Sequence, residues 1–106
     1  MIRAVMYWDR LRLEVNGHAE YDEKGKDIVC AGASMLTGAL AAALEEAEER
    51  GRCECKAKID EGKALIWAEA AMGSRQEIKA YFKMAVAGYK LLQEKYAGNV
   101  TIREVM

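Results

Sequence analysis

Leu11, Leu13 and Val15 alternate with Arg10, Arg12 and Glu14, a pattern typical of a strand that buries one face and exposes the other, and a mostly apolar run that contains Arg3 precedes them. We predict two strands, over residues 2 to 8 and 9 to 16, which meet at a tight turn around Trp8, Asp9 and Arg10. In the second strand, leucine and valine share one face, and arginine and glutamate share the other. The chain is therefore expected to begin with a half-buried hairpin.

Two longer stretches place their apolar residues at helical spacing. Asp27 has the short acceptor side chain of an N-cap, and a helix over residues 28 to 50 is predicted to follow it and to end at Gly51. Ser74 and Glu77 match a capping box, so we predict a second helix from there to a stop near Gly98.

Residues 52 to 59 alternate again and lead through a turn into a strand over residues 63 to 69. The turn comprises Asp60, Glu61 and Gly62. The face of the first strand that we predict to be buried carries Cys53, Cys55, Ala57 and Ile59. With a last strand over residues 100 to 105, the order is ββαββαβ. It predicts one α+β domain over residues 1 to 106, a two-layer sandwich of a mostly antiparallel sheet and two helices.

The composition narrows the function classes. A length of 106 residues fits one domain, and the balance of 16 basic and 17 acidic side chains argues against binding nucleic acid or a membrane surface through bulk charge. The three cysteines are an odd number, which suggests no disulfide framework. No export signal or membrane span is expected, so we predict a soluble cytoplasmic protein. Burial explains Cys53 and Cys55 better than a metal site, and no metal or other cofactor is predicted.

Candidate chemistry centres on the single histidine, His18, and on Cys30, twelve residues later. If Asp27 is the N-cap, Cys30 lies in the first turn of the helix, where free N–H groups and the helix dipole favour a thiolate. The same N–H groups are candidates to receive an oxyanion. A capping carboxylate would occupy the N–H of Cys30, however, so we expect Asp27 mainly to shape the loop or to orient His18.

Structural roles compete with these chemical ones. A cysteine in an alanine-rich helix is more often a buried small residue, and a histidine after a glycine is more often a loop residue. Ser34 lies one turn after Cys30, where its hydroxyl either bonds near the thiol or, by default, returns to the backbone carbonyl of Cys30. The polar residues between His18 and Asp27 predict a loop that orders over a bound substrate as a lid. The candidate substrate contacts in this loop are Ala19, Glu20, Tyr21, Asp22 and Gly25.

The same stretch resembles the signature of the ribosomal-processing cysteine protease family called Prp. The matching residues are Gly17-His18-Ala19, Gly25, Asp27-Ile28-Val29-Cys30-Ala31, Ser34 and Leu36. The order of the predicted elements also agrees over nearly the whole chain. Where members of the family usually carry Ala-Ala-Val-Ser after the cysteine, this chain has Ala31-Gly32-Ala33-Ser34, so Gly32 departs from the pattern without touching a catalytic group.

The resemblance implies a cytosolic bacterial endopeptidase that acts as a homodimer. Its substrate would be the N-terminal extension of the twenty-seventh large-subunit ribosomal protein, cut after an aromatic residue. Cys30 would be the nucleophile and His18 the general base and acid, with Asp27 and Ser34 in supporting roles. Two alternatives remain: a non-enzymatic ribosome-assembly or interaction module in which Cys30 is structural, and thiol acyl transfer or redox chemistry. No Cys-x-x-Cys motif favours the redox alternative.

Overall fold

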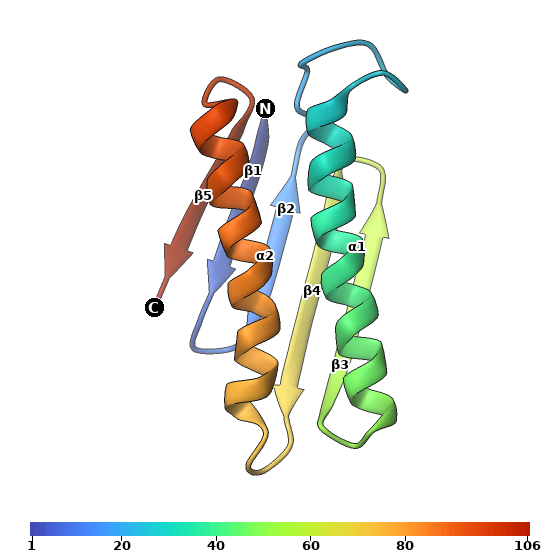
Figure 1. Ribbon diagram of the computed structural model, residues 1–106, viewed down its shortest axis with the longest axis vertical. Helices are drawn as coiled ribbons and strands as arrows, with labels where there is room; N and C mark the ends of the chain where they lie inside the picture. Colours follow the sequence, from blue (N-terminus) through green and yellow to red (C-terminus); the bar gives the residue numbers. More distant parts are fainter.

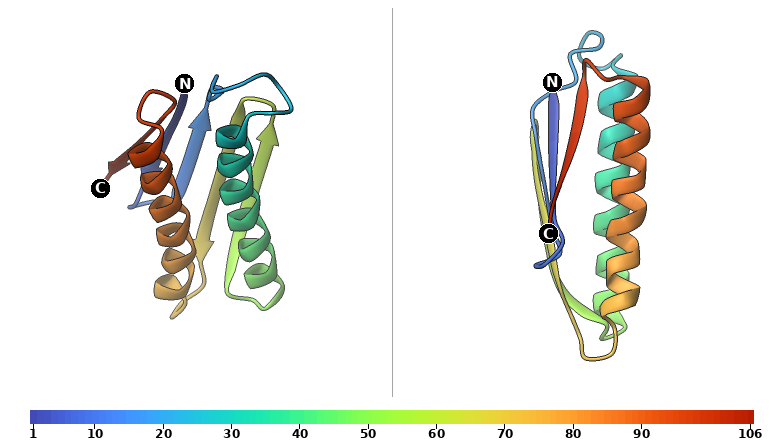
Figure 2. Two further views of the ribbon diagram at one scale, coloured as in Figure 1. Left: turned by 45° about the horizontal axis from the view of Figure 1, so that its top comes forward. Right: turned by 90° about the vertical axis from the view of Figure 1, so that its left-hand side faces the viewer.

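Five strands form one sheet, and two helices lie side by side on one of its faces (Figures 1 and 2). The computed structural model describes all 106 residues. The elements are β1 (Ile2–Tyr7), β2 (Arg12–Asn16), α1 (Ile28–Glu49), β3 (Cys53–Asp60), β4 (Lys63–Ala70), α2 (Arg75–Lys95) and β5 (Val100–Val105). The predicted α+β class, the two layers and the ββαββαβ order are confirmed.

The strand order in the sheet is β3-β4-β2-β1-β5. Neighbouring strands are antiparallel except β1 and β5, which are parallel, so the sheet is mostly antiparallel as predicted. This topology brings four segments to one end of the molecule (Figure 1). They are the N-terminus, the loop between β2 and α1, the β3–β4 turn and the loop between α2 and β5. The candidate site lies at this end.

The first turn is longer than predicted. It spans residues 8 to 11, so β2 begins at Arg12 rather than at Asp9. Leu11 takes a positive φ of 43°, an unusual value for a leucine, while its side chain is completely buried. Burial of this side chain outweighs the backbone cost, because apolar burial of a leucine is worth about 1.5–3 kcal/mol.

Helix α1 is long and apolar enough to cross a membrane, with a mean hydropathy of 1.6 over its most apolar window. Its buried residues instead form the face that packs into the core of the sandwich. Those residues are Val29, Ala33, Thr37, Leu40, Ala41, Leu44 and Ala47. A core helix satisfies the same length and composition test as a membrane span, but only 33% of this window is buried, so packing accounts for part of the apolar character of α1.

The two helices approach closely at Gly88 of α2. A methyl group there would lie 2.3 Å from Cδ2 of Leu36, so the glycine makes room for a leucine from α1. At Gly32 a methyl group would lie 3.4 Å from Leu92, which is ordinary contact. The alanine common at that position in the family would therefore fit, and Gly32 is not required by the packing.

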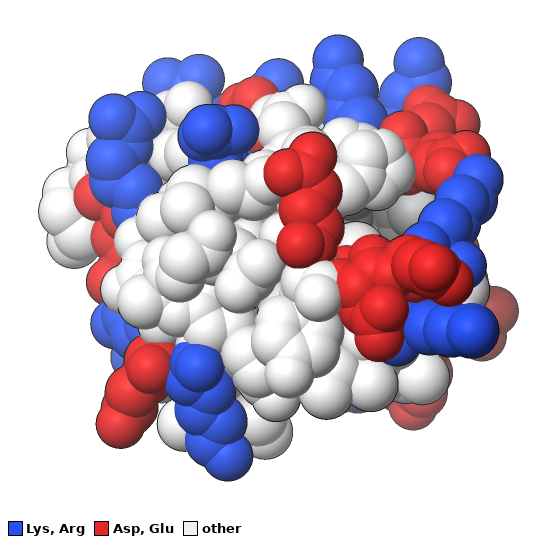
Figure 3. All heavy atoms as spheres, turned by 90° about the horizontal axis from the view of Figure 1, so that it is seen from above, with Lys and Arg blue, Asp and Glu red and all other residues white.

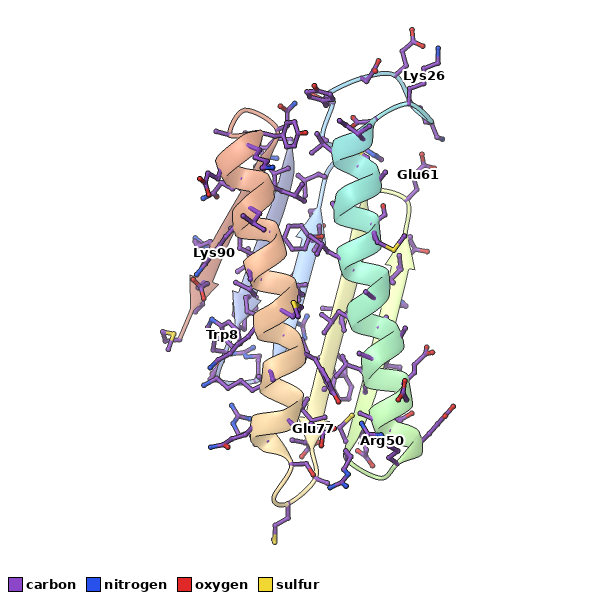
Figure 4. The ribbon with its side chains drawn as sticks, in the orientation of Figure 1. Trp8, Lys26, Arg50, Glu61, Glu77 and Lys90 are labelled. Atoms are coloured by element: carbon purple, nitrogen blue, oxygen red, sulfur yellow. The ribbon has the colours of Figure 1, made fainter.

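Two sequence-based expectations about packing are wrong. Ser74 precedes α2 but makes no side-chain capping bond, and the Glu77 carboxylate accepts hydrogen bonds from Arg50 and Tyr81 instead, each at 2.8 Å (Figure 4). In β3, only the first residues of the predicted inner face are covered: Cys53 is buried, while Ile59 is 52% exposed. β3 is an edge strand, and its last residues extend beyond the core to the end where the site lies.

Candidate active site

A glycine directs the chain out of β2 toward the site. Gly17 has a φ of +98°, and a methyl group on it would lie 2.1 Å from the backbone oxygen of Met1. Only glycine combines this backbone conformation with so close an approach. The Gly17 N–H also donates to the carbonyl of Gly62 at 2.9 Å. The backbone immediately before His18 is thus held between Met1 and Gly62.

Asp27 joins the loop to the helix. Its Oδ1 accepts the N–H groups of Val29 and Cys30, both at 2.9 Å, and the predicted N-cap is confirmed. Its Oδ2 accepts the N–H groups of Tyr21 at 2.9 Å and Asp22 at 3.3 Å. Burial raises the pKa of this carboxyl, but the four donors outweigh burial and lower the pKa below its ordinary value. Asp27 therefore caps α1 and shapes the loop at once, and it makes no hydrogen bond to His18.

Cys30 is the third residue of α1, and its half-buried sulfur faces the loop. The N–H of Ala19 donates to Cys30 Sγ at 3.3 Å. The N–H groups of the first turn of α1 point elsewhere, because Val29 and Cys30 bind the Asp27 carboxylate and Ala31 binds the Asp27 carbonyl. These three N–H groups are therefore occupied in this structure and are not free to receive an oxyanion. Ala19 supplies the donor aimed at the sulfur.

His18 is exposed, and its ring lies against the β3–β4 turn. A methyl group on Gly62 would come within 2.7 Å of His18 Nε2, so the glycine leaves the space that the imidazole occupies. No hydrogen bond joins His18 to Cys30, although both residues line the same cleft. A movement of the loop or of the side chain is needed before the imidazole can exchange a proton with the thiol.

The cleft has a volume of about 650 Å³ and lies between the loop, the start of α1 and the β3–β4 turn. Its apolar lining is formed by Ile2, Val15, Ala33, Ile59, Ala64 and Tyr89. Charged residues surround this lining: Glu20, Asp22, Lys24, Asp60, Glu61 and Lys63. Seen from this end, acidic side chains gather on one side while uncharged surface covers much of the rest (Figure 3). The cleft thus offers an apolar interior and a rim that is more acidic than basic.

An ion pair bridges the two walls of the cleft. Lys24 Nζ from the loop lies 2.6 Å from Glu61 Oε1 at the β3–β4 turn. Figure 4 shows Glu61 below the end of the loop that carries Lys26. Both partners are highly exposed, so the pair contributes little to stability and is easily broken. It marks the place where the loop and the turn face one another.

The structure separates the candidate loop residues into two groups. Glu20, Asp22 and Gly25 line the cleft. Tyr21 turns away and packs edge-on against Tyr96, with ring centroids 5.2 Å apart. Ala19 is buried beneath the loop rather than facing the cleft.

Ser34 lines the cleft and is exposed. The predicted return of its hydroxyl to the backbone is not seen. Thr37 makes that kind of bond instead, donating to the carbonyl of Ala33 at 2.9 Å while its hydroxyl also lies 2.7 Å from the Tyr89 hydroxyl. Ser34 therefore keeps a free hydroxyl at the cleft wall, one turn from Cys30.

The other two cysteines differ from Cys30 in their surroundings. Cys53 is buried and its thiol lies 3.6 Å from the carbonyl of Leu44. Burial and the nearby Glu48 carboxylate raise the pKa of Cys55 to about 11, and the same two causes raise the pKa of Cys53. Both therefore remain neutral thiols at physiological pH.

Most of the chain also matches a known family of proteins. The family model for the cysteine protease Prp matches residues 1–101. The chain belongs to the Prp family of cysteine proteases. No curated protein matches it.

Solved structures with the Prp fold cover nearly all of the chain. The Staphylococcus aureus ribosomal-processing protease Prp, in complex with a covalently linked product peptide, matches with a TM-score of 0.77 and 20% identity over 98% of this chain and 99% of that chain. The same S. aureus protease with a substrate peptide gives a TM-score of 0.72, again at 20% identity over 98% and 99%. The protein SMU.848 from Streptococcus mutans gives a TM-score of 0.74 at 28% identity, over 99% and 94%. Their likeness to this chain is one of fold.

Two residues at the Prp site escaped sequence-based prediction as functional candidates. Asn99 donates from its side chain to the carbonyl of Ala19 at 2.8 Å, although 80 positions separate them. Gly62 provides the space for the His18 ring. The sequence predicts a turn at Gly62 and a helix stop beside Asn99, and neither pattern carries a signal of what these residues contact.

Proposed function

We propose that this protein is a cysteine endopeptidase in which Cys30 is the nucleophile and His18 is the general base and acid. The observation that carries the proposal is the shared cleft, into which the start of α1 presents Cys30 and the end of β2 presents His18. The Ala19 N–H directed at the sulfur supports it, because a hydrogen bond to a thiolate favours the charged, nucleophilic form.

The chemistry follows from these roles. His18 takes the thiol proton, and the Cys30 sulfur bonds to the carbonyl carbon of the scissile peptide. The C–N bond then breaks as the imidazolium gives its proton to the departing amine, which leaves a thioester. Neutral His18 next removes a proton from water as the water oxygen bonds to the thioester carbon; the C–S bond then breaks, which releases the carboxyl product, and the imidazolium returns its proton to the sulfur.

Because His18 and Cys30 are not hydrogen-bonded in the free protein, the loop from His18 to Asp27 is proposed to close as a lid. Closure requires the exposed Lys24–Glu61 pair to open or shift, while the bonds of Ala19, Tyr21 and Asp22 hold the start of the loop in place. Amide hydrogen exchange of residues 19 to 26 should slow when a non-cleavable peptide binds. Unchanged amide exchange of these residues in the peptide-saturated complex would refute the proposed lid.

The proposed substrate is the N-terminal extension of the twenty-seventh large-subunit ribosomal protein, cut after an aromatic residue. The S. aureus proteases of the same fold process ribosomal protein and were crystallised with peptides. The apolar lining of the cleft suits an aromatic side chain, and its acidic rim suits a basic chain. Action in the cytoplasm as a homodimer belongs to the same proposal and rests on the family resemblance.

The rate of thiol alkylation against pH tests the proposed nucleophile without any substrate. With modified cysteines identified by mass spectrometry, Cys30 should react much faster than Cys53 and Cys55 near pH 7, because burial and Glu48 keep those two protonated. Equal rates would favour the non-enzymatic ribosome-assembly module, in which Cys30 is a packing residue. That alternative also predicts that a Cys30→Ala protein supports growth as well as the wild type.

A further inference from the structure

We infer that Asn99 is a positioning residue for the nucleophile: its side-chain amide holds Ala19 so that the Ala19 N–H points at the Cys30 sulfur. The inference rests on the proposed function, since it assigns a role to Asn99 only if Cys30 reacts as a thiolate. The contact joins the loop between α2 and β5 to the loop between β2 and α1, at the end of the molecule where the cleft lies (Figure 1).

The side chain of Asn99 extends from a fixed turn. Its backbone N–H donates to the carbonyl of Tyr96 at 2.8 Å, and its carbonyl accepts the N–H of Ile2, also at 2.8 Å. With the backbone held on both sides, the Nδ2 group reaches the Ala19 carbonyl at 2.8 Å. The donor is therefore anchored to β1 and α2, which do not belong to the loop that it holds.

Ala19 is held from both ends. Its N–H binds Cys30 Sγ at 3.3 Å, its carbonyl binds Asn99, and its side chain is 1% exposed. The next residue, Glu20, has a φ of +56°, which is disfavoured for a residue other than glycine or asparagine. Such a backbone persists only where surrounding bonds determine it. Without the Asn99 bond, the Ala19–Glu20 peptide can relax and move the N–H away from the sulfur.

The sulfur depends on this donor because the helix does not supply one. The Asp27 carboxylate takes the N–H groups of Val29 and Cys30, and it also places a negative charge close to the thiol. The Ala19 N–H is the donor that faces the sulfur, and Asn99 keeps it in place.

The test replaces the amide of Asn99 by a carboxylate. Asn99→Asp preserves size but cannot donate, and Asn99→Ala removes the group without adding charge. The matched control is Gln93→Glu in α2, because its Oε1 accepts the N–H of Ile102 at 2.8 Å and keeps that bond after the change. The readouts are the pH profile of Cys30 alkylation, kcat and KM on a peptide that spans the cleavage site, and Tm.

Both Asn99 variants should move the alkylation profile of Cys30 upward by about one pH unit, the scale of one hydrogen bond to a charged group. They should lower kcat about ten- to hundredfold with little change in KM, as happens when a residue that orients a reactive group is removed. Gln93→Glu should change neither the alkylation profile of Cys30 nor kcat. A folded Asn99 variant with the wild-type profile and kcat would overturn the inference and leave the protease proposal standing. A wild-type protein that cleaves nothing would instead refute the protease proposal, while the alkylation profile would still decide the role of Asn99.

Discussion

The space that Gly62 leaves for His18 leads to a sharp prediction about catalysis. In Gly62→Ala, the new methyl group would lie 2.7 Å from His18 Nε2 and 3.1 Å from the neighbouring ring carbon. Ordinary contact begins at 3.4 Å, so the imidazole must retreat by about 0.7 Å. Misplacement of a reacting group by about 1 Å can cost about a hundredfold in rate. We therefore expect kcat to fall about ten- to hundredfold.

The substitution also strains the backbone, and the chain offers a matched control for that effect. Gly62 and Gly51 both have a φ of +73°, but a methyl group on Gly51 meets nothing within 4 Å. Each alanine should cost about 1–2 kcal/mol for the left-handed backbone. A loss of that size lowers Tm by about 4–8 °C per kcal/mol in a domain of this length. The two variants should therefore have similar Tm values and very different activities.

The assay measures kcat and KM for cleavage of a precursor peptide by both variants, together with Tm from thermal unfolding. Gly51→Ala should retain nearly full activity. Equal activity of the two variants, at equal Tm, would show that the resting position of the His18 ring against Gly62 does not affect catalysis, because the ring must leave that position to reach Cys30. That result would refute the predicted need for space at Gly62, and His18→Ala would then test the general base and acid directly.

Two further predictions concern stability. Asp27→Ala should lower the free energy of unfolding in urea by about 2 kcal/mol at pH 7, because a helix cap and two loop bonds are lost together. Folding lowers the pKa of Asp27 from 3.8, so the ionised carboxylate contributes its full stabilisation above pH 3.8. This stabilisation is lost as the pH falls through the lower pKa of the folded state. A difference in unfolding free energy between Asp27→Ala and the wild type that stayed constant down to pH 2 would contradict this prediction. In the helices, Gly38→Ala should stabilise by about 0.5–1 kcal/mol because its methyl group meets nothing, whereas Gly88→Ala should be destabilised by its clash with Leu36, typically by about 1–3 kcal/mol. Equal Tm values for these two variants would be inconsistent with the close helix contact.

Local signals predicted the elements and the start of the site. A polar acceptor before an apolar helical pattern is a short-range feature, so the sequence places Asp27 at the cap and Cys30 in the first turn. The antiparallel pairing of β3 with β4 likewise follows from the short turn between them, which the sequence predicts at Asp60, Glu61 and Gly62. In these places the chain contacts only its own neighbours, and the sequence contains the whole interaction.

The features of the site and of the helix cap that the sequence did not predict depend on contacts between residues far apart in the chain. Asn99 reaches Ala19 across 80 positions, and the Glu77 carboxylate binds Arg50 instead of completing the predicted capping box. The N-cap at Asp27 already implies that the N–H of Cys30 is bonded. The N–H of Ala19 that faces the Cys30 sulfur, by contrast, depends on how the loop folds back over Cys30. These features arise from tertiary structure, and no pattern of spacing encodes them.

The most direct test of the account is incubation of the purified protein with the precursor of the organism's twenty-seventh large-subunit ribosomal protein. The N-terminus of the product would then be determined by mass spectrometry. We predict that the wild type cuts the precursor once, after an aromatic residue, and that Cys30→Ala and His18→Ala do not cut it. A precursor left intact by the wild type would contradict the proposed substrate, and cleavage by Cys30→Ala at the wild-type rate would contradict the proposed nucleophile.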